Sequence, residues 1–436
     1  VDTSRPGRVS DLRVGRCRPD VISPRRGTDK SKRFLWLIAR LSVFSLLAAA
    51  WGDDDDVDGS ETGTDTAEET TGGEDTEGDA AAAGGEGSIW VLLPDSATSD
   101  RWEKDDRRFF KEGFEAEGLV EDQDFTIVNA EGSGETQISQ AEQAIGDGAS
   151  VLVMTSNDSG SGATIIDLAK DAGVAVVEYD RFNTEGSAGG DVYVSFDNVK
   201  VGATMAEVAT PVIDALEADP KRVVMLNGGE TDNNAFLFRD GYNATVEEKV
   251  AAGEWELVDD QYVPEWDNQA AQDLMDGILV AAENDVDAVF AANDGLGGAV
   301  IASLENAGLD PLEVPVTGQD ATEAGIQNVL LGKQTMSVYK PIKEEAAAAV
   351  AAALALRAGE AVTELTGGDW VFIGIDAEGQ PTDSPEGDGV VPYMALTPIG
   401  VTADNVADTV IADGFRTVEE LCTEDVAETD FCQENA

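Results

Sequence analysis

Polar residues follow the apolar segments of this chain, and their types suit hydrogen bonding to hydroxyl groups. The stretch NGGETDNNAFLFRDG (227–241) comes directly after RVVML (222–226), an apolar run typical of a buried parallel strand. Within it, Asp232 and Asn234 together supply the acceptors and donors that a hydroxyl group needs. Two interpretations stay open: these residues line a ligand crevice at the carboxyl end of the strand, or Asp232 simply caps the following helix.

The same arrangement recurs after nearly every other apolar segment. The residues at these positions are Arg101 with Trp102, Asp180 with Arg181, Asp197 with Asn198, Asn293 with Asp294, Gln319 with Asp320, and Lys340. Each of them alone could cap a helix or close a turn. Together they predict a crevice in which carboxylates and amides bind paired hydroxyls, arginine donates two hydrogen bonds, and an aromatic face stacks on a sugar ring. The predicted ligand is therefore a carbohydrate.

The elements that must position these residues are alternating strands and helices. Helical spacing separates most of the apolar runs, which indicates repeated βα units and parallel sheets covered on both faces. The expected strands are 89–94, 125–130, 151–156, 174–180, 192–197, 222–227, 255–263, 288–294, 314–320 and 335–340. So many strands favour an α/β fold of two doubly wound lobes, with a closed eight-stranded barrel as the alternative.

The charge balance is extreme, with 28 Lys and Arg against 87 Asp and Glu and a formal net charge of −59. The first 50 residues hold 11 of the basic and 4 of the acidic residues, which leaves 17 basic and 83 acidic residues and a net charge of −66 for the remainder. Such a surface argues against nucleic acids and anionic membranes as partners, because both carry phosphate charge. It is typical of halophilic proteins, in which salt screens the self-repulsion.

The sequence lacks residues that several common catalytic and nucleotide-binding motifs require. The sequence has no histidine, which removes Ser-His-Asp and Cys-His catalysis and the zinc sites that need histidine. In NDGLGGAV (293–300), Val300 stands where GxGxxG requires its third glycine, and no GxxxxGK[ST] loop occurs. SGSGA (159–163) lacks the glycine that precedes the serine of a nucleophile elbow. We expect no enzyme activity, no metal and no cofactor, with paired carboxylates for glycoside hydrolysis as the open alternative.

Residues 1–50 are basic and end in an apolar segment. Lys30, Lys32 and Arg33 precede FLWLIARLSVFSLLAAA, a pattern that predicts a secretory signal peptide and an extracytoplasmic protein, in the periplasm or at the cell surface. The sequence LLAAAWGDDDD resembles a lipoprotein signal, but Trp51 replaces the cysteine that accepts the lipid, so a lipid anchor is in doubt. Residues 51–87 are mostly acidic or small and are expected to form a disordered tether.

Two cysteines lie in the acidic tail, residues 416–436. Cys422 and Cys432 are ten residues apart, whereas Cys17 lies upstream of the expected signal peptide. In an oxidising compartment the tail cysteines would pair and close a short loop; the alternative is two free thiols.

Residues 88–417 resemble the type I periplasmic sugar-binding protein family of bacterial ABC transporters, and within it the D-xylose branch. The matching stretches are RWEKD (101–105), SGETQISQAEQAI (133–145), EYDR (178–181), YVSFDNVKVG (193–202), GGETDNNAFLFRDG (228–241), AANDGLGGAVIASL (291–304), TGQDA (317–321), QTMSVYKPI (334–342) and LTPIGVTADNVADTVIADGF (396–415). The resemblance implies two Rossmann-like lobes joined by three hinge crossovers near Asp197, Thr317 and Gly367, with the sugar bound between them. The first lobe would comprise 88–197 and 317–366, and the second 198–316 and 367–415.

The resemblance also implies which residues contact the sugar. These are Arg101, Trp102, Arg181, Asp232, Asn234, Tyr262, Asp294, Asp320, Lys340 and Asn198. Trp102 and Tyr262 are expected to supply the two stacking faces. The sequence departs from the family pattern at Tyr262, where the family has tryptophan, and at Ala270, where relatives have asparagine.

The expected function is capture of a monosaccharide, D-xylose first of all, by hinge closure of a monomer that delivers it to the permease of an ABC importer. A binding protein that presents another pentose or hexose to a chemosensory receptor is one alternative, and an α/β carbohydrate enzyme is another. A sugar-responsive repressor would need a basic helix-turn-helix, in whose place the sequence has an export signal and an acidic tether.

Overall fold

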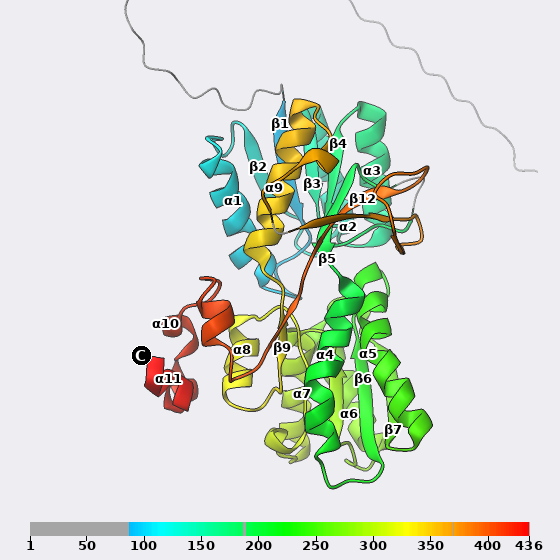
Figure 1. The fold of residues 1–436 in the computed structure, drawn as a ribbon, viewed down its shortest axis with the longest axis vertical. Helices are drawn as coiled ribbons and strands as arrows, with labels where there is room; N and C mark the ends of the chain where they lie inside the picture. Colours follow the sequence, from blue (N-terminus) through cyan, green and yellow to red (C-terminus); the bar gives the residue numbers. More distant parts are fainter. Residues whose placement is uncertain (1–86, 186–188, 369, 436) are drawn as a thin grey trace, which may run out of the picture. The chain divides into compact units, whose positions relative to one another are not determined.

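The computed structural model of the protein describes residues 87–185, 189–368 and 370–435. The expected signal peptide and residues 51–86 of the expected tether lie outside this part of the chain. Among the described residues, no helix combines the length and the apolarity needed to cross a bilayer. The described residues form two α/β lobes followed by a short helical tail (Figure 1).

The first lobe is built on an eight-stranded sheet with the order β11-β10-β12-β5-β4-β3-β1-β2. Its strands are β1 (Ser88–Leu93), β2 (Phe125–Asn129), β3 (Ala149–Met154), β4 (Ala175–Tyr179), β5 (Val192–Phe196), β10 (Val371–Ile375), β11 (Pro381–Thr382) and β12 (Val391–Leu396). The pairs from β12 to β2 are parallel, while β10 is antiparallel to both of its neighbours. The parallel part confirms the predicted α/β class.

Helices cover both faces of this sheet because successive strand residues point to opposite sides. Val91 and Val153 belong to one apolar core, whereas the neighbouring Leu92 and Leu152 belong to another. Helices α1 (Arg107–Ala116) and α9 (Ile342–Ala358) pack together, and α9 lies on β3, β4 and β5. Helices α2 (Gly134–Gly146) and α3 (Ser159–Ala172) also pack together and contact β1, β3 and β4.

The second lobe has a parallel sheet of the order β7-β6-β8, formed by β6 (Lys221–Asn227), β7 (Trp255–Tyr262) and β8 (Ala288–Ala291). Isolated bridges at Val316 and Gln319 extend it towards the antiparallel pair of β9 (Ser337–Tyr339) and β13 (Ile399–Val401). Its helices are α4 (Asn198–Asp214), α5 (Asn233–Ala252), α6 (Asn268–Ala281), α7 (Asp294–Ala307) and α8 (Glu323–Leu330). Its shorter helical turns are η3 (Pro311–Glu313) and η5 (Ala407–Ile411), whereas η4 (Val362–Glu364) packs against α9 of the first lobe.

Two of the three crossovers differ from their expected positions. The first crossover lies at Asp197, between β5 and α4. The second lies between β9 and α9 rather than near Thr317, because α8 and β9 pack against α7, α4 and β13 of the second lobe. The third lies between β12 and β13 rather than near Gly367, because β12 pairs with β5 of the first lobe. The first lobe is therefore 88–196 with 342–396, and the second is 198–339 with 399–415.

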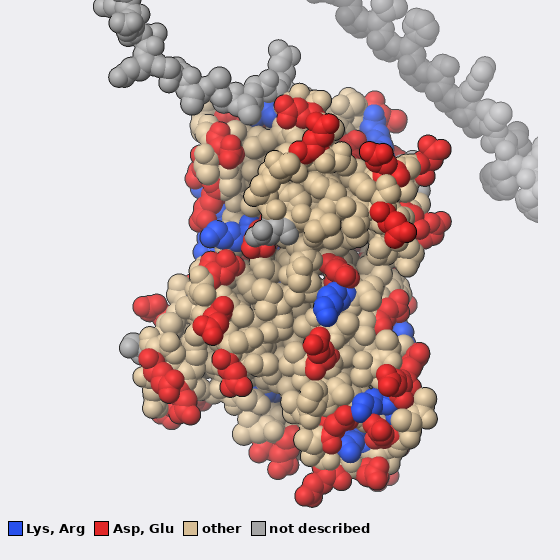
Figure 2. Space-filling model, viewed as in Figure 1, with Lys and Arg blue, Asp and Glu red and all other residues tan. Residues whose placement is uncertain are grey.

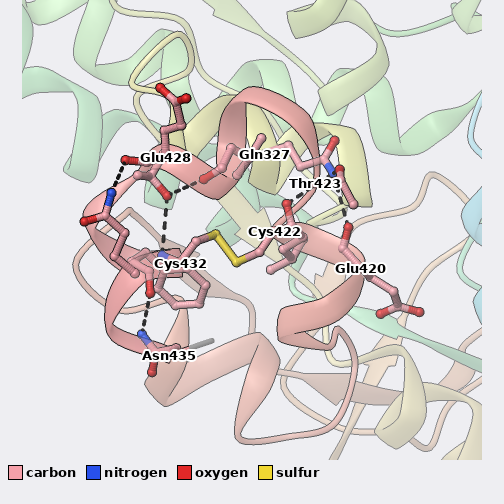
Figure 3. Close-up of a disulfide and its surroundings, with 12 residues drawn as sticks. Gln327, Glu420, Cys422, Thr423, Glu428, Cys432 and Asn435 are labelled. Carbon is pink, nitrogen blue, oxygen red and sulfur yellow. Dashed lines mark hydrogen bonds between the residues drawn. A yellow bond between two sulfur atoms is a disulfide. The ribbon is translucent and has the colours of Figure 1, made fainter.

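The acidic tail forms a compact helical cap. It contains α10 (Val418–Leu421), the turn η6 (Glu424–Glu428) and α11 (Asp430–Asn435). A disulfide between Cys422 and Cys432 closes it, with the Cα atoms 5.5 Å apart, which confirms the pairing and rules out two free thiols (Figure 3). Gln327 of α8 donates hydrogen bonds to the carbonyl oxygens of Glu420 and Leu421, so the tail is fixed to the second lobe.

Acidic side chains dominate the charged surface. Figure 2 shows Asp and Glu spread over the visible face of both lobes, with few Lys or Arg among them. On this face the excess of acidic over basic side chains therefore lies at the surface of both lobes.

Candidate functional site

A polar cavity lies between the two lobes at the carboxyl ends of their strands, and it holds about 330 Å³ of atom-free space, part of it open to solvent. Its lining residues are Thr98, Ser99, Arg101, Trp102, Asp180, Arg181, Asp232, Asn234, Phe238, Trp266, Asn293, Gln319, Asp320 and Lys340. Carboxyl ends of parallel strands are where open α/β sheets bind ligands, because helix N-termini and loops converge there.

Arg101 and Trp102 enter the cavity at the start of a single wide helical turn, η1 (Trp102–Asp106). The Arg101 side chain is 1% exposed, and its Nε and Nη2 donate to both carboxylate oxygens of Asp106 at 3.0 and 2.9 Å. The guanidinium carbon lies 4.1 Å from the centre of the Trp102 ring. These contacts fix the indole, because the cation holds one of its faces.

Asp180 joins the cations of the cavity. Its Oδ2 accepts hydrogen bonds from Arg101 Nη1 and from Lys340 Nζ, each at 3.0 Å. Burial opposes ionisation of this carboxyl, yet Lys340 and Arg101 outweigh it and hold its pKa well below the usual range. Asp320 Oδ1 lies 3.3 Å from Lys340 Nζ and 3.5 Å from Arg101 Nη1 and so neighbours the same two cations.

Asp232 caps a helix and also lines the cavity. Its Oδ1 accepts from the backbone N–H of Asn234 at 2.9 Å, at the N-terminus of α5. Its Oδ2 lies 3.0 Å from Arg181 Nε of the first lobe and accepts from Trp266 Nε1 at 3.2 Å. Burial raises the pKa of Asp232, and the Arg181 cation counteracts this.

Trp266 is the second tryptophan in the cavity lining. The sequence interpretation had assigned the second stacking face to Tyr262. Trp266 ends the short turn η2 (Pro264–Trp266) with a left-handed φ of 57°, and it is 6% exposed. A Cβ atom at Gly228 would lie 2.0 Å from its ring, so only glycine leaves room for the indole. Tyr262 packs instead against Phe236, with ring centres 5.2 Å apart, and is not among the lining residues. The paired glycines after β6 were the sequence signal for a bulky side chain above them.

Asn198 and Asp294 also lie behind the cavity rather than in its lining. Asn198 Nδ2 donates to Asn234 Oδ1 at 2.9 Å and so orients the amide that faces the cavity. The Asp294 carboxylate accepts from Gln334 Nε2 at 2.7 Å and from the Thr322 N–H at 2.9 Å. Both residues therefore hold lining segments in place.

The structure thus brings seven of the ten expected contact residues together in the lining. They are Arg101, Trp102, Arg181, Asp232, Asn234, Asp320 and Lys340. The expected contact set lacked seven others, namely Thr98, Ser99, Asp180, Phe238, Trp266, Asn293 and Gln319. Asp180, Asn293 and Gln319 belong to the strand-end pattern, whereas Thr98, Ser99 and Phe238 carry no signal of their own in the sequence.

The chemistry of the cavity suits an uncharged ligand with many hydroxyls. Three cations, from Arg101, Arg181 and Lys340, face the three carboxyl groups of Asp180, Asp232 and Asp320. Three buried polar atoms of the lining have no hydrogen-bond partner: Ser99 Oγ, Trp102 Nε1 and Gln319 Oε1. Because unpaired buried polar atoms are costly, a ligand that pairs with them gains affinity. Among the described residues, no group of three or more His, Cys, Asp or Glu is arranged to hold a metal ion.

Comparison with known proteins gives a consistent set of relatives. A family model described as a periplasmic binding protein domain matches residues 90–361. The D-xylose-binding periplasmic protein of Escherichia coli strain K12 is 36% identical over 330 residues, which are 75% of this chain and 90% of that protein.

Two solved structures resemble this one over most of its described residues. A carbohydrate transporter solute-binding protein from Chloroflexus aurantiacus, in complex with D-glucose, is 25% identical with a TM-score of 0.63, and covers 76% of this chain and 97% of its own. An ABC transporter solute-binding protein from Clostridium phytofermentans, with bound β-D-glucose, is 25% identical with a TM-score of 0.64. The match covers 76% of this chain and 99% of that protein.

Proposed function

We propose a function for this chain from the family to which it belongs, that of the periplasmic binding proteins. It captures a monosaccharide outside the cytoplasm and delivers it to the permease of an ABC importer. The proposed working form is a monomer.

The balanced charges and unpaired polar atoms of the cavity support this function most directly. Each cation in the lining already has a carboxylate partner within 3.5 Å, so a charged ligand would leave one charge uncompensated. A neutral sugar disturbs no pair and offers hydroxyls that both donate and accept. The indoles of Trp102 and Trp266 add flat apolar faces of the kind that pack against a sugar ring.

D-xylose is the sugar that we propose first. The relative with 36% identity over most of both chains is named as a D-xylose-binding protein. D-glucose, in contrast, is bound in the two more distant solved structures. The two sugars differ by one hydroxymethyl group, so a cavity of the same architecture discriminates them by the space at that position. D-glucose is therefore the first competitor to test.

Hinge closure is the mechanism that fits the contacts. The first lobe contributes Arg101, Trp102 and Arg181, and the second contributes Asp232 and Trp266. A sugar can touch both sets only when the lobes are together, so binding shifts the population towards the closed form. Closure also places Arg181 against Asp232, which links the two sides of the cavity by an ion pair.

Calorimetric titration in molar salt tests the proposal. The protein is titrated with D-xylose, D-glucose, D-ribose, D-galactose and L-arabinose, and saturable one-to-one binding of D-xylose is expected. Binding of a different sugar from the panel would correct the sugar but keep the class. No binding of any of them would refute the function.

Asp232→Ala tests the site within the same experiment. Loss of a buried paired acceptor costs about 1–3 kcal/mol, which raises Kd roughly 5- to 150-fold. Asp158→Ala is the matched control, because Asp158 caps α3 in the same way but lies outside the cavity lining. Equal affinities of the wild-type protein and Asp232→Ala would show that Asp232 only caps its helix.

A further inference from the structure

Arg416 stands at the start of the tail and contacts both lobes, although it does not line the cavity. Its guanidinium donates from Nη1 and Nη2 to the two carboxylate oxygens of Asp105, each at 2.9 Å. Its Nε donates to the carbonyl oxygen of Ala321 at 3.1 Å. Arg416 is 7% exposed, so these contacts are shielded from water and weigh more than a surface ion pair.

Both partners of Arg416 belong to segments that carry cavity residues. Asp105 lies in η1, the turn that begins with Trp102 and follows Arg101. Ala321 follows Asp320, and both residues have left-handed φ angles, of 47° and 91°. Such a turn of non-glycine residues persists only when surrounding contacts hold it. One guanidinium therefore joins a cavity segment of the first lobe to a strained cavity turn of the second.

The residue before Arg416 repeats this bridging with apolar contacts. The ring of Phe415 lies 6.4 Å from that of Phe109 in α1, and 4.9 Å from that of Tyr339 in β9. The guanidinium carbon of Arg416 lies 3.9 Å from the centre of the same Phe415 ring. Phe415 and Arg416 thus form one packed unit between the lobes.

The tail fixes this unit to the second lobe. Thr417 caps α10, and its backbone N–H donates to Glu420 in a reciprocal capping box. Gln327 of α8 donates to the carbonyl oxygens of Glu420 and Leu421 and to the hydroxyl of Thr423, and the disulfide closes the segment that follows (Figure 3). Arg416 therefore reaches across to Asp105 from an anchored position.

We propose that Arg416 is a positioning residue for the sugar cavity. It holds the turn that carries Arg101 and Trp102 against the turn that carries Asp320, so the affinity for sugar depends on an ion pair outside the cavity. This inference rests on the proposed function, because the affinity in question is that for a monosaccharide.

The test measures Kd for D-xylose and D-glucose by calorimetry in Arg416→Gln, Asp105→Asn and the double variant. Each single change is expected to weaken binding by roughly tenfold, since it breaks a shielded, charge-assisted contact between the lobes. The double variant is expected to bind about as weakly as either single one, because both changes remove the pairing of Arg416 with Asp105, and the other contact of Asp105, to Arg108 at 3.3 Å, lies within the first lobe. Arg416→Lys keeps the positive charge but cannot donate two parallel hydrogen bonds to Asp105, so its Kd should lie between those of the wild-type protein and Arg416→Gln.

Arg239→Gln is the matched control. Arg239 pairs with Asp260 inside the second lobe and is outside the cavity lining, so its loss should lower the melting temperature and leave Kd unchanged. Thermal melting of every variant is recorded alongside, so that effects on folding and on binding are separated.

Each outcome decides the matter. A lower melting temperature with wild-type Kd in Arg416→Gln would make the residue purely structural and overturn the inference. Additive losses in the double variant would do the same, because they would show two independent roles. If Arg416→Gln does not fold, the isosteric Asp105→Asn decides alone. Failure of the wild-type protein to bind any sugar of the panel would refute the proposed function, and the inference with it.

Discussion

Single side chains set the properties of this cavity through their neighbours more than through their own chemistry. Asp180 stays ionised at full burial because Arg101 and Lys340 both donate to it. Arg101 in turn is held by hydrogen bonds to Asp106. Burial raises the pKa of Asp106, and the guanidinium of Arg101 opposes this rise. A substitution at any one of these positions leaves a buried charge without its partner, so its effect should exceed that of removing one sugar contact.

Gly228 is expected to be as important for binding as any residue in the lining. Gly228→Ala places a methyl group 2.0 Å from the Trp266 ring and should expel the indole from the cavity. We expect binding of D-xylose to weaken at least tenfold, because Trp266 also donates to Asp232. Gly277→Ala in α6 is the control, since a Cβ there meets nothing within 4 Å. Calorimetry on both variants checks the prediction, and equal affinities would contradict it.

Asp294 should make stability depend on pH. Burial raises its pKa from 3.8 to about 7 in the folded protein. The folded state therefore binds more protons than the unfolded state between about pH 4 and pH 7, and the free energy of unfolding falls as the pH rises through this window. The loss is at most about 4 kcal/mol, at 1.36 kcal/mol per pKa unit.

Denaturant unfolding between pH 4.5 and 8 measures this effect. Asp294→Asn should flatten the decline, whereas Asp276→Asn, at an exposed position of α6, should leave it unchanged. An equally steep decline in Asp294→Asn would assign the effect to other buried carboxyls.

At the scale of elements, the disulfide is expected to stabilise the cap. It closes a loop with a sequence separation of 10 residues, which predicts a stabilisation of about 2–3 kcal/mol by the loop-entropy relation. Cys422→Ser with Cys432→Ser should lower the free energy of unfolding accordingly, as denaturant titration would show. Reduction of the wild-type protein should reproduce the effect and leave the double variant unchanged. Identical unfolding curves would mean that the hydrogen bonds of Gln327 hold the cap by themselves.

The strands of the parallel sheets could be predicted from the sequence because each is a short apolar run bounded by polar residues. The segment 371–396 was missed, since its strands are separated by Gly, Pro and acidic residues and one of them has only two residues. The second and third crossovers were misplaced for a different reason. Apolar strand residues such as Val338 and Val391 could be buried in the sheet of either lobe. Only the strands with which they pair decide the lobe to which they belong.

The candidate site was predictable where it follows strand ends, and not where it depends on turns. Asp232 and Lys340 come directly after apolar runs, so their positions followed from the fold. Trp266 lies on a turn with a left-handed backbone, which few side chains adopt and no periodicity signals. The sequence interpretation therefore placed the second stacking aromatic at Tyr262, four residues before Trp266.

At the scale of the whole molecule, the net charge of −59 should make stability depend on salt. Screening lengths fall from about 10 Å at 0.1 M salt to about 3 Å at 1 M, which weakens the repulsion between surface carboxylates. The melting temperature should rise by about 2–4 °C for each 1 kcal/mol of repulsion removed. Scanning fluorimetry in NaCl and in KCl should give matching increases, because screening does not distinguish the two cations. A flat response would mean that the surface charges are already compensated.

The order of the chain also has a consequence for how this protein is made. Strand β5 pairs with β4 as soon as both exist, but its other edge waits for β12, where Leu396 pairs with Phe196. Between the two, the chain must produce most of the second lobe, including β6, β7 and β8, which are consecutive along the chain and pair with one another. During synthesis or translocation the first lobe therefore carries an open, apolar strand edge until β12 is made, and the second lobe is completed only after that, by β13. That edge is where newly made molecules would join one another and aggregate, and where a chaperone would be needed.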